Sequence, residues 1–136
     1  MDDAARGFAG PGRGLPLPLA AIYRGVVRTP PTEHDPILAE IVRRLNEAYR
    51  PERIYLFGSV ARGDASLDSD YDLLLVVPDD APLELRRSRR AYEVLRGTGV
   101  AADVIVWTRG AFDRRSRARA SLPATVLREG RVLGGT

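Results

Sequence analysis

Two aspartates separated by one residue are the strongest chemical signal in this sequence. Asp70 and Asp72 lead into a run that is apolar as far as Val77. In a strand, residues i and i+2 point to the same face, with Cα atoms roughly 6.7 Å apart. Two carboxylates that close repel each other unless a cation lies between them. The pair therefore predicts a site for one or two divalent cations at the end of a strand.

A third acid is available on a later strand. Asp103 is the lone acid in the apolar run 100–107, where we expect a buried strand. An unpaired buried carboxylate is costly, so Asp103 needs a partner. If the two strands are neighbours, Asp103 reaches the face of Asp70 and Asp72 and completes a triad. An arginine partner or a position at the strand end would explain it equally well.

A candidate phosphate site precedes the aspartates. Gly58 and Ser59 follow a short run of strand-forming residues, and Arg62 comes three positions later. Glycine lets the backbone approach a ligand, a serine hydroxyl can donate to a phosphate oxygen, and arginine can donate twice. An ordinary turn is the alternative for this segment. Asp64 and Asp68, in the polar loop that follows, are interpreted as solvated turn residues.

Composition excludes several kinds of chemistry. The 136 residues contain no cysteine, and all 21 basic residues are arginine. Thiolate metal sites, cysteine nucleophiles and lysine Schiff bases are therefore excluded. The one histidine, His34, is expected at the surface. Any strong metal site must be built from carboxylates, which favours magnesium, manganese or calcium.

Charge and hydropathy indicate where the protein acts. The net charge is only +3, and the arginine runs 86–90 and 114–119 are not interleaved with aromatic residues. We therefore expect solvated helix faces and no nucleic-acid partner. No apolar run has the length of a membrane span, and the sequence starts with Met-Asp-Asp, an acidic start unlike that of a secretory signal. A cytoplasmic protein with no membrane partner is the prediction.

The sequence divides into two parts. Residues 1–32 are rich in glycine and proline, which predicts a disordered N-terminal tail. Residues 33–136 form the predicted domain. Its helix starts at Asp35 and Pro36 and is stopped by Pro51.

The later elements alternate between strands and helices. Strands are predicted over residues 53–57, 71–77 and 100–107, and helices over 83–96, 111–120 and 122–129. Tyr92 is assigned to the core face of the 83–96 helix. The order α-β-β-α-β-α predicts an α/β (α+β) domain with a small mixed sheet packed with helices.

The segment from Gly58 to Leu73 resembles the minimal nucleotidyltransferases of the DNA polymerase β superfamily. Their signature is Gly-Ser, often followed by x-Ala-Arg-Gly, then Asp-x-Asp and a later acid. The matching positions here are Gly58, Ser59, Ala61, Arg62, Gly63, Ser69, Asp70, Asp72 and Leu73, with Asp103 as the later acid. The resemblance covers residues 35–134 and implies a polymerase-β-like nucleotidyltransferase fold.

The resemblance also implies a mechanism. Asp70 and Asp72 would hold two Mg²⁺ ions, and Asp103 would complete one metal shell and help deprotonate an attacking hydroxyl. Gly58, Ser59 and Arg62 would bind the β- and γ-phosphates of ATP. AMP would pass to the hydroxyl, and pyrophosphate would leave.

The size of the chain bears on its acceptor. Larger nucleotidyltransferases carry further domains that bind the acceptor, so a chain this small leaves little room for such a pocket. The resemblance to MntA-like antitoxins implies a separate HEPN toxin that receives AMP on a tyrosine.

Two alternatives remain open. The chain could be a non-catalytic module that masks a partner, although such a module need not keep three acids. It could instead be a small-molecule nucleotidyltransferase whose acceptor pocket forms in a homodimer.

Overall fold

The computed structural model describes residues 29–135. The chain divides after Pro30, and every described helix and strand lies in the second unit, Pro31–Thr136. Most of the expected tail, residues 1–32, lies outside the described residues. No helix in the described part of the chain is long and apolar enough to cross a membrane.

Four strands form one mixed sheet. They are β1 (Arg53–Phe57), β2 (Tyr71–Val77), β3 (Ala102–Thr108) and β4 (Arg131–Gly134). The order across the sheet is β3-β2-β1-β4, with β1 antiparallel to both neighbours and β2 parallel to β3. The mixed α/β sheet predicted from the sequence is therefore confirmed.

Strand β2 has apolar side chains on both faces because it lies inside the sheet. Leu73, Leu75 and Val77 pack into one cluster, and Leu74 and Val76 into another. Both sets are almost fully buried. This alternation is what a strand covered on both faces requires, as its uninterrupted apolar run predicted.

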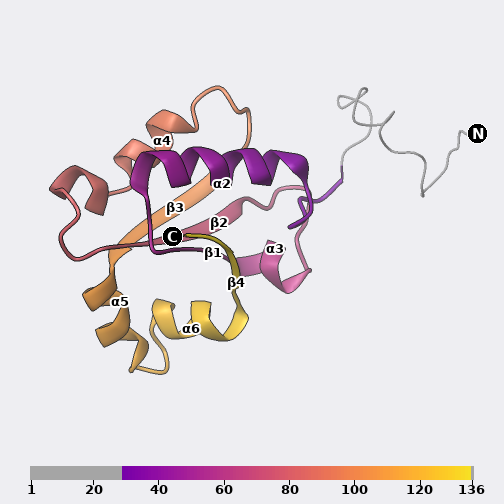
Figure 1. Ribbon diagram of the computed structural model, residues 1–136. Coiled ribbons are helices and arrows are strands. Elements are labelled where there is room, and N and C mark those ends of the chain that lie inside the picture. The colour runs from indigo at the N-terminus through magenta and orange to yellow at the C-terminus, as the bar shows by residue number, and fades with distance from the viewer. Residues whose placement is uncertain (1–28, 136) are drawn as a thin grey trace, which may run out of the picture. The chain divides into compact units, whose positions relative to one another are not determined.

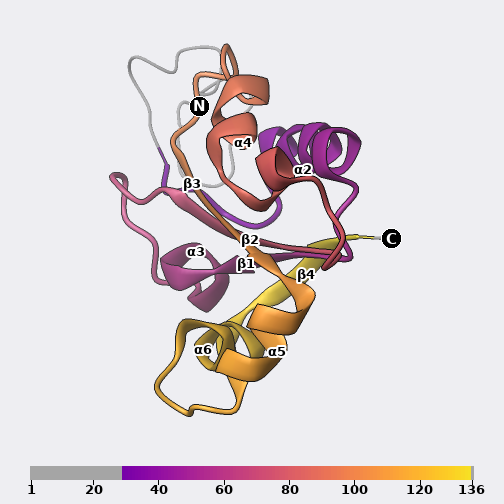
Figure 2. The same cartoon turned by 90° about the vertical axis from the view of Figure 1, so that its left-hand side faces the viewer.

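Helices cover both faces of the sheet. One face carries α2 (Pro36–Tyr49) and α4 (Arg89–Val94), and the other carries α5 (Arg109–Ser116) and α6 (Leu122–Glu129), as Figures 1 and 2 show. The short helix α3 (Gly58–Arg62) follows β1 directly.

The N-terminus of α2 departs from simple capping. Asp35 is at the N-cap position and Pro36 follows it, as predicted, but the Asp35 carboxylate caps no helix amide. It accepts hydrogen bonds from the Tyr71 hydroxyl at 2.6 Å and from the Thr32 amide at 3.0 Å. The carboxylate therefore ties the start of the helix to β2.

The predicted single helix over residues 83–96 is wrong. The structure has a 3₁₀ turn, Leu83–Arg86, then extended backbone at Arg87, then α4. The hydroxyl of buried Tyr49 donates to the Arg87 carbonyl at 2.6 Å and accepts from the Ala91 amide at 2.8 Å. These two bonds take the place of helical ones and break the helix at Arg87.

Two expectations about burial are also wrong. Asp103 is exposed, because β3 is at the edge of the sheet and not inside it. Tyr92 is 45% exposed, because Ala91 and Leu95 already form the buried stripe of α4 and Tyr92 is turned away from them. Strand β4, which the sequence pattern did not predict, adds the other edge of the sheet.

Candidate active site

Asp72 and Asp103 are direct neighbours on parallel strands. They are register partners, just as Leu74 pairs with Ile105 and Val76 with Trp107. Those two apolar pairs belong to the cluster on the α5/α6 face. Because side chains alternate along a strand, Asp72 and Asp103 lie on that same face of the sheet, at the start of β2 and β3.

Asp70 adds a third negative charge. It is exposed and comes just before β2, two residues ahead of Asp72. Partial burial raises the pKa of Asp72, and the negative charges of Asp103 and Asp70 raise it further, while Arg62 acts in the opposite direction. The three carboxylates are therefore close enough to interact electrostatically.

Gly58 lies against the Asp72 carboxylate. Its φ is +77°, and a Cβ built on it would overlap Oδ2 of Asp72. Only glycine meets both conditions, a left-handed backbone and no side-chain atom. The chain turns there from β1 into α3, and Phe57 just before it is the β1 register partner of Asp72. Asp72 thus lies between Phe57 and Asp103, with the Gly58 backbone closing on its carboxylate.

Serines fix the loop between α3 and β2. The Ser59 hydroxyl donates to Oγ of Ser69 at 3.1 Å, and the Ser66 amide donates to the same oxygen at 2.8 Å. Ser69 comes directly before Asp70. The two bonds therefore connect the candidate phosphate-binding serine to the residue beside the first aspartate, and they hold the loop ends together.

Arg62 is engaged within the chain. Its Nε donates to Oδ2 of Asp64 at 3.2 Å, and its Nη1 lies 3.5 Å from Oε1 of Glu129 at the end of α6. The Arg62 side chain is 46% exposed. Asp64, interpreted above as a solvated turn residue, is exposed but paired, and sequence reasoning did not identify Glu129. A phosphate would have to compete with these two carboxylates for the guanidinium.

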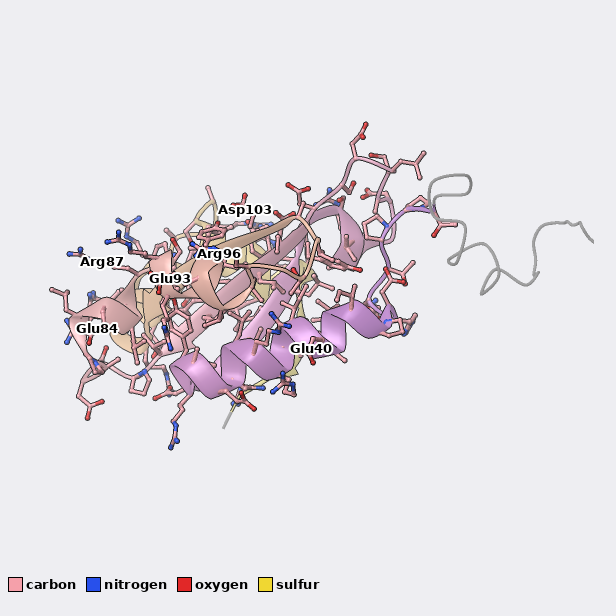
Figure 3. The ribbon with its side chains drawn as sticks, turned by 90° about the horizontal axis from the view of Figure 1, so that it is seen from above. Glu40, Glu84, Arg87, Glu93, Arg96 and Asp103 are labelled. Carbon is pink, nitrogen blue, oxygen red and sulfur yellow. The ribbon has the colours of Figure 1, made fainter. Side chains whose placement is uncertain are left out.

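Tyr92 is a site residue that sequence reasoning missed. Its hydroxyl donates to Oδ1 of Asp103 at 3.2 Å and accepts from the Val104 amide at 3.1 Å. Seen from above in Figure 3, Asp103 lies toward the α4 side chains and away from Glu40 of α2. The signal was available, since a residue one position after buried Ala91 points about 100° away from the core stripe.

The three carboxylates of the site can be compared with what a divalent cation requires of its ligands. Among residues 29–135, no three potential ligands already stand at metal-ligand spacing. However, Asp72 and Asp103 are adjacent, and the pKa of Asp72 is raised first by partial burial and then by the negative charges of Asp103 and Asp70. Carboxylate oxygens are what Mg²⁺ prefers, and a cation would remove that repulsion. The chemistry of these residues therefore fits Mg²⁺, which Asp70, Asp72 and Asp103 would hold.

Comparisons with known proteins identify the family. Residues 37–131 match the family described as nucleotidyltransferase domain. The chain is 36% identical over 100 residues to a protein of Methanocaldococcus jannaschii named protein adenylyltransferase MJ0604, covering 71% of this chain and 93% of that one. This chain therefore belongs to the nucleotidyltransferase family, whose members generally use divalent metal ions.

Two solved structures resemble this chain. The toxin–antitoxin MntA-HpeT, in a mutant form, is 19% identical with a TM-score of 0.50, covering 72% of this chain and 73% of that chain. A structure of a tri-AMPylated Shewanella oneidensis HEPN toxin in complex with an MNT antitoxin is 18% identical with a TM-score of 0.46, covering 74% and 71%. At this identity the MntA-HpeT likeness shows the nucleotidyltransferase fold alone.

Proposed function

We propose that this chain transfers AMP from ATP to a hydroxyl group on a partner protein. The observation that carries the proposal is the register pairing of Asp72 with Asp103 beside the Gly58 backbone. It gives a chain of the nucleotidyltransferase family the paired carboxylates that the reaction requires. We further propose that residues 33–136 form the catalytic domain.

Asp70, Asp72 and Asp103 are the residues that would hold two Mg²⁺ ions. When bound, Mg²⁺ supplies positive charge that offsets the triphosphate and the charge developing on the attacking and leaving oxygens. Asp72 and Asp103, fixed by neighbouring strands, set the position of the reacting phosphate relative to the sheet. Asp70, at the end of the loop held by Ser69, adds a third carboxylate just before β2.

The reaction exchanges one phosphorus–oxygen bond for another. The acceptor hydroxyl oxygen bonds to the α-phosphorus of ATP, and the bond from that phosphorus to the β-phosphate bridge breaks, which releases pyrophosphate. Asp103, exposed at the sheet edge, accepts the proton of the attacking hydroxyl. Asp72, which is partly buried between Phe57 and Asp103, serves as a ligand only.

Gly58, Ser59 and Arg62 would bind the β- and γ-phosphates. Gly58 brings the backbone close to the carboxylates without a side chain, and Ser59 offers a hydroxyl one residue later. Arg62 would exchange its contacts with Asp64 and Glu129 for phosphate oxygens. A triphosphate carries more charge than either carboxylate, which favours the exchange.

A protein acceptor is supported by the name of the 36% identical relative, protein adenylyltransferase. The more specific partner, a tyrosine of a HEPN toxin neutralised by this chain as its antitoxin, follows from the resemblance described above. The matched chain of the MntA-HpeT structure shares the fold of this chain. A toxin is therefore the kind of partner to test first. An ATP-dependent reaction of this kind belongs in the cytoplasm.

The test is the intact mass of the protein encoded by the adjacent gene. That partner protein is incubated with ATP, Mg²⁺ and this chain. In a parallel reaction, the Asp70→Asn/Asp72→Asn double variant replaces the natural chain. We expect the partner to gain one or more AMP units with the natural chain and none with the variant. An unchanged partner mass in both reactions would contradict protein adenylylation.

The same samples separate the two alternatives. A masking module would neutralise its partner equally well with or without Asp70 and Asp72, whereas the enzyme would not. A small-molecule nucleotidyltransferase would release pyrophosphate with a small acceptor, leave the partner unmodified and be a homodimer at working concentration.

A further inference from the structure

The Tyr92 hydroxyl connects α4 to the edge of the sheet. It donates its hydrogen to Oδ1 of Asp103 at 3.2 Å and accepts the Val104 amide hydrogen at 3.1 Å. Among the strands of residues 29–135, β3 pairs only with β2, so no described strand lies along its outer side. The Tyr92 hydroxyl occupies part of that side and bonds to two consecutive residues of the strand.

The helix that carries Tyr92, α4, is itself held by hydrogen bonds from the end of α2. Tyr49, almost fully buried at the end of α2, donates to the Arg87 carbonyl at 2.6 Å and accepts from the Ala91 amide at 2.8 Å. Ala91 is the residue before Tyr92 and is itself buried. The position of the Tyr92 ring is therefore set by the core, although the ring itself is 45% exposed.

Asp103 is a carboxylate that needs such a contact. It is exposed at an edge strand, and its register partner is the like-charged Asp72. Repulsion between the two carboxylates favours rotation of the exposed one away from its partner. A hydrogen-bond donor fixed by the core restricts that rotation by holding one of the two carboxylate oxygens.

We propose that Tyr92 is a positioning residue for Asp103, holding one carboxylate oxygen so that the other stays available to a cation or an acceptor hydroxyl. This inference rests on the proposed function, because it assigns Asp103 to the reacting centre. It gives the exposed side of α4 a role in addition to the packing of Ala91 and Leu95 in the core. Tyr92 acts through Asp103 and does not itself have to touch the substrate.

The experiment compares Tyr92→Phe with Tyr49→Phe by titration with Mg²⁺ alone. Both variants remove one hydroxyl from the same region, but only the first removes a contact to Asp103. The readout is the Mg²⁺ concentration that gives half of the rise in unfolding temperature. Tyr92→Phe is expected to raise this midpoint about tenfold, the lower end of the effect of removing a partner of a metal ligand. Tyr49→Phe is expected to lower the unfolding temperature without Mg²⁺ but to leave the midpoint within about twofold, because buried Ala91 and Leu95 still pack α4 against the core when the Tyr49 hydroxyl is removed.

Kinetics with MgATP and the partner protein give the second readout. Tyr92→Phe is expected to lower kcat about tenfold, with the KM for ATP unchanged, because the phosphate-binding residues are untouched. A Tyr92→Phe variant with the natural Mg²⁺ midpoint and the natural kcat would overturn the proposal. If the natural chain modifies no acceptor, the proposed function fails, while the Mg²⁺ midpoints still decide the role of Tyr92.

Discussion

The two faces of the sheet differ in how they use the same strands. On the α2/α4 face, Leu73, Leu75 and Val77 of β2 join a large cluster of buried residues. On the α5/α6 face, the buried cluster is Leu74, Val76, Phe112 and Val126. Asp72 continues the second row toward the start of the strand.

This difference separates stability from chemistry within one strand. The face with the larger cluster supplies most of the buried apolar area and therefore most of the hydrophobic stabilisation. The face with the smaller cluster leaves space at one end for carboxylates that repel one another. Because the alternation of β2 assigns each residue to one face, substitutions one position apart are expected to affect different properties.

The largest expected effect is the loss of nucleotidyl transfer in Asp72→Asn. Removing this charge takes away several kcal/mol of transition-state stabilisation, so the rate should fall by about a thousandfold or more. The measurement is AMP incorporation into the partner protein. Asp68→Asn, in the exposed loop, is the matched control and should keep the natural rate. Comparable losses in both variants would show that the paired carboxylates have no special role.

The next effect is on stability and compares Leu75→Ala with Leu74→Ala. Both side chains are fully buried on the same strand, but they belong to the larger and the smaller cluster. We expect losses of about 4 kcal/mol for Leu75→Ala and about 2.5 kcal/mol for Leu74→Ala, since a cavity collapses less easily in the larger cluster. Urea unfolding measures both. The reverse order would place the main core on the α5/α6 face.

A smaller effect is expected from Gly58→Ala, with Gly63→Ala as its control. Both glycines have positive φ, but only at Gly58 would the new Cβ overlap Asp72. Each variant should lose about 1 kcal/mol from backbone strain, and Gly58→Ala should also lose at least about tenfold in activity because the carboxylate is displaced. The measurements are thermal unfolding and initial rates. Equal activity in the two variants would mean that the contact with Asp72 is unimportant.

The smallest effect is the gain in stability of metal-free Asp72→Asn. Burial and the charges of Asp103 and Asp70 raise the pKa of Asp72 in the folded state, so its ionised form opposes folding. That cost is present at neutral pH and disappears as the pH falls below the unfolded pKa near 3.9. Asp72→Asn should therefore be more stable at pH 7 by no more than about 1 kcal/mol after solvent screening, and the difference should shrink on acidification. Unfolding midpoints measured in chelator between pH 3 and 7 test this. A variant less stable than the natural chain at pH 7 would contradict the repulsion.

The strands that carry the acids were predictable from local pattern. The apolar run after Asp72 indicated an interior strand, and the single acid in the run 100–107 indicated the third carboxylate position. Their neighbour relation could be stated only as a condition, because the pairing of β2 with β3 is a long-range property. The structure supplies it in the register of Asp72 with Asp103.

The features that were missed depend on tertiary contacts. The break at Arg87 results from the Tyr49 hydroxyl, which lies 38 residues earlier in the sequence. Strand β4 has four residues and is extended because it pairs with β1, as Leu56 does with Arg131. Helix α3 has five residues, too few for a helical period to be recognised. The contact of Tyr92 with Asp103 was missed for two reasons. Helix α4 is too short to be recognised by its period, and the edge position of β3 is a tertiary property.

The central claim is that one end of the α5/α6 face binds a metal-bound nucleotide. A crystal structure with Mg²⁺ and a non-hydrolysable ATP analogue tests it most directly. We predict Mg²⁺ within about 2.1 Å of carboxylate oxygens of Asp72 and Asp103, with the β- and γ-phosphates at Gly58 and Ser59. A nucleotide bound elsewhere, such as in the cavity lined by Tyr55, Arg109 and Phe112 at the other end of the same face, would contradict the account.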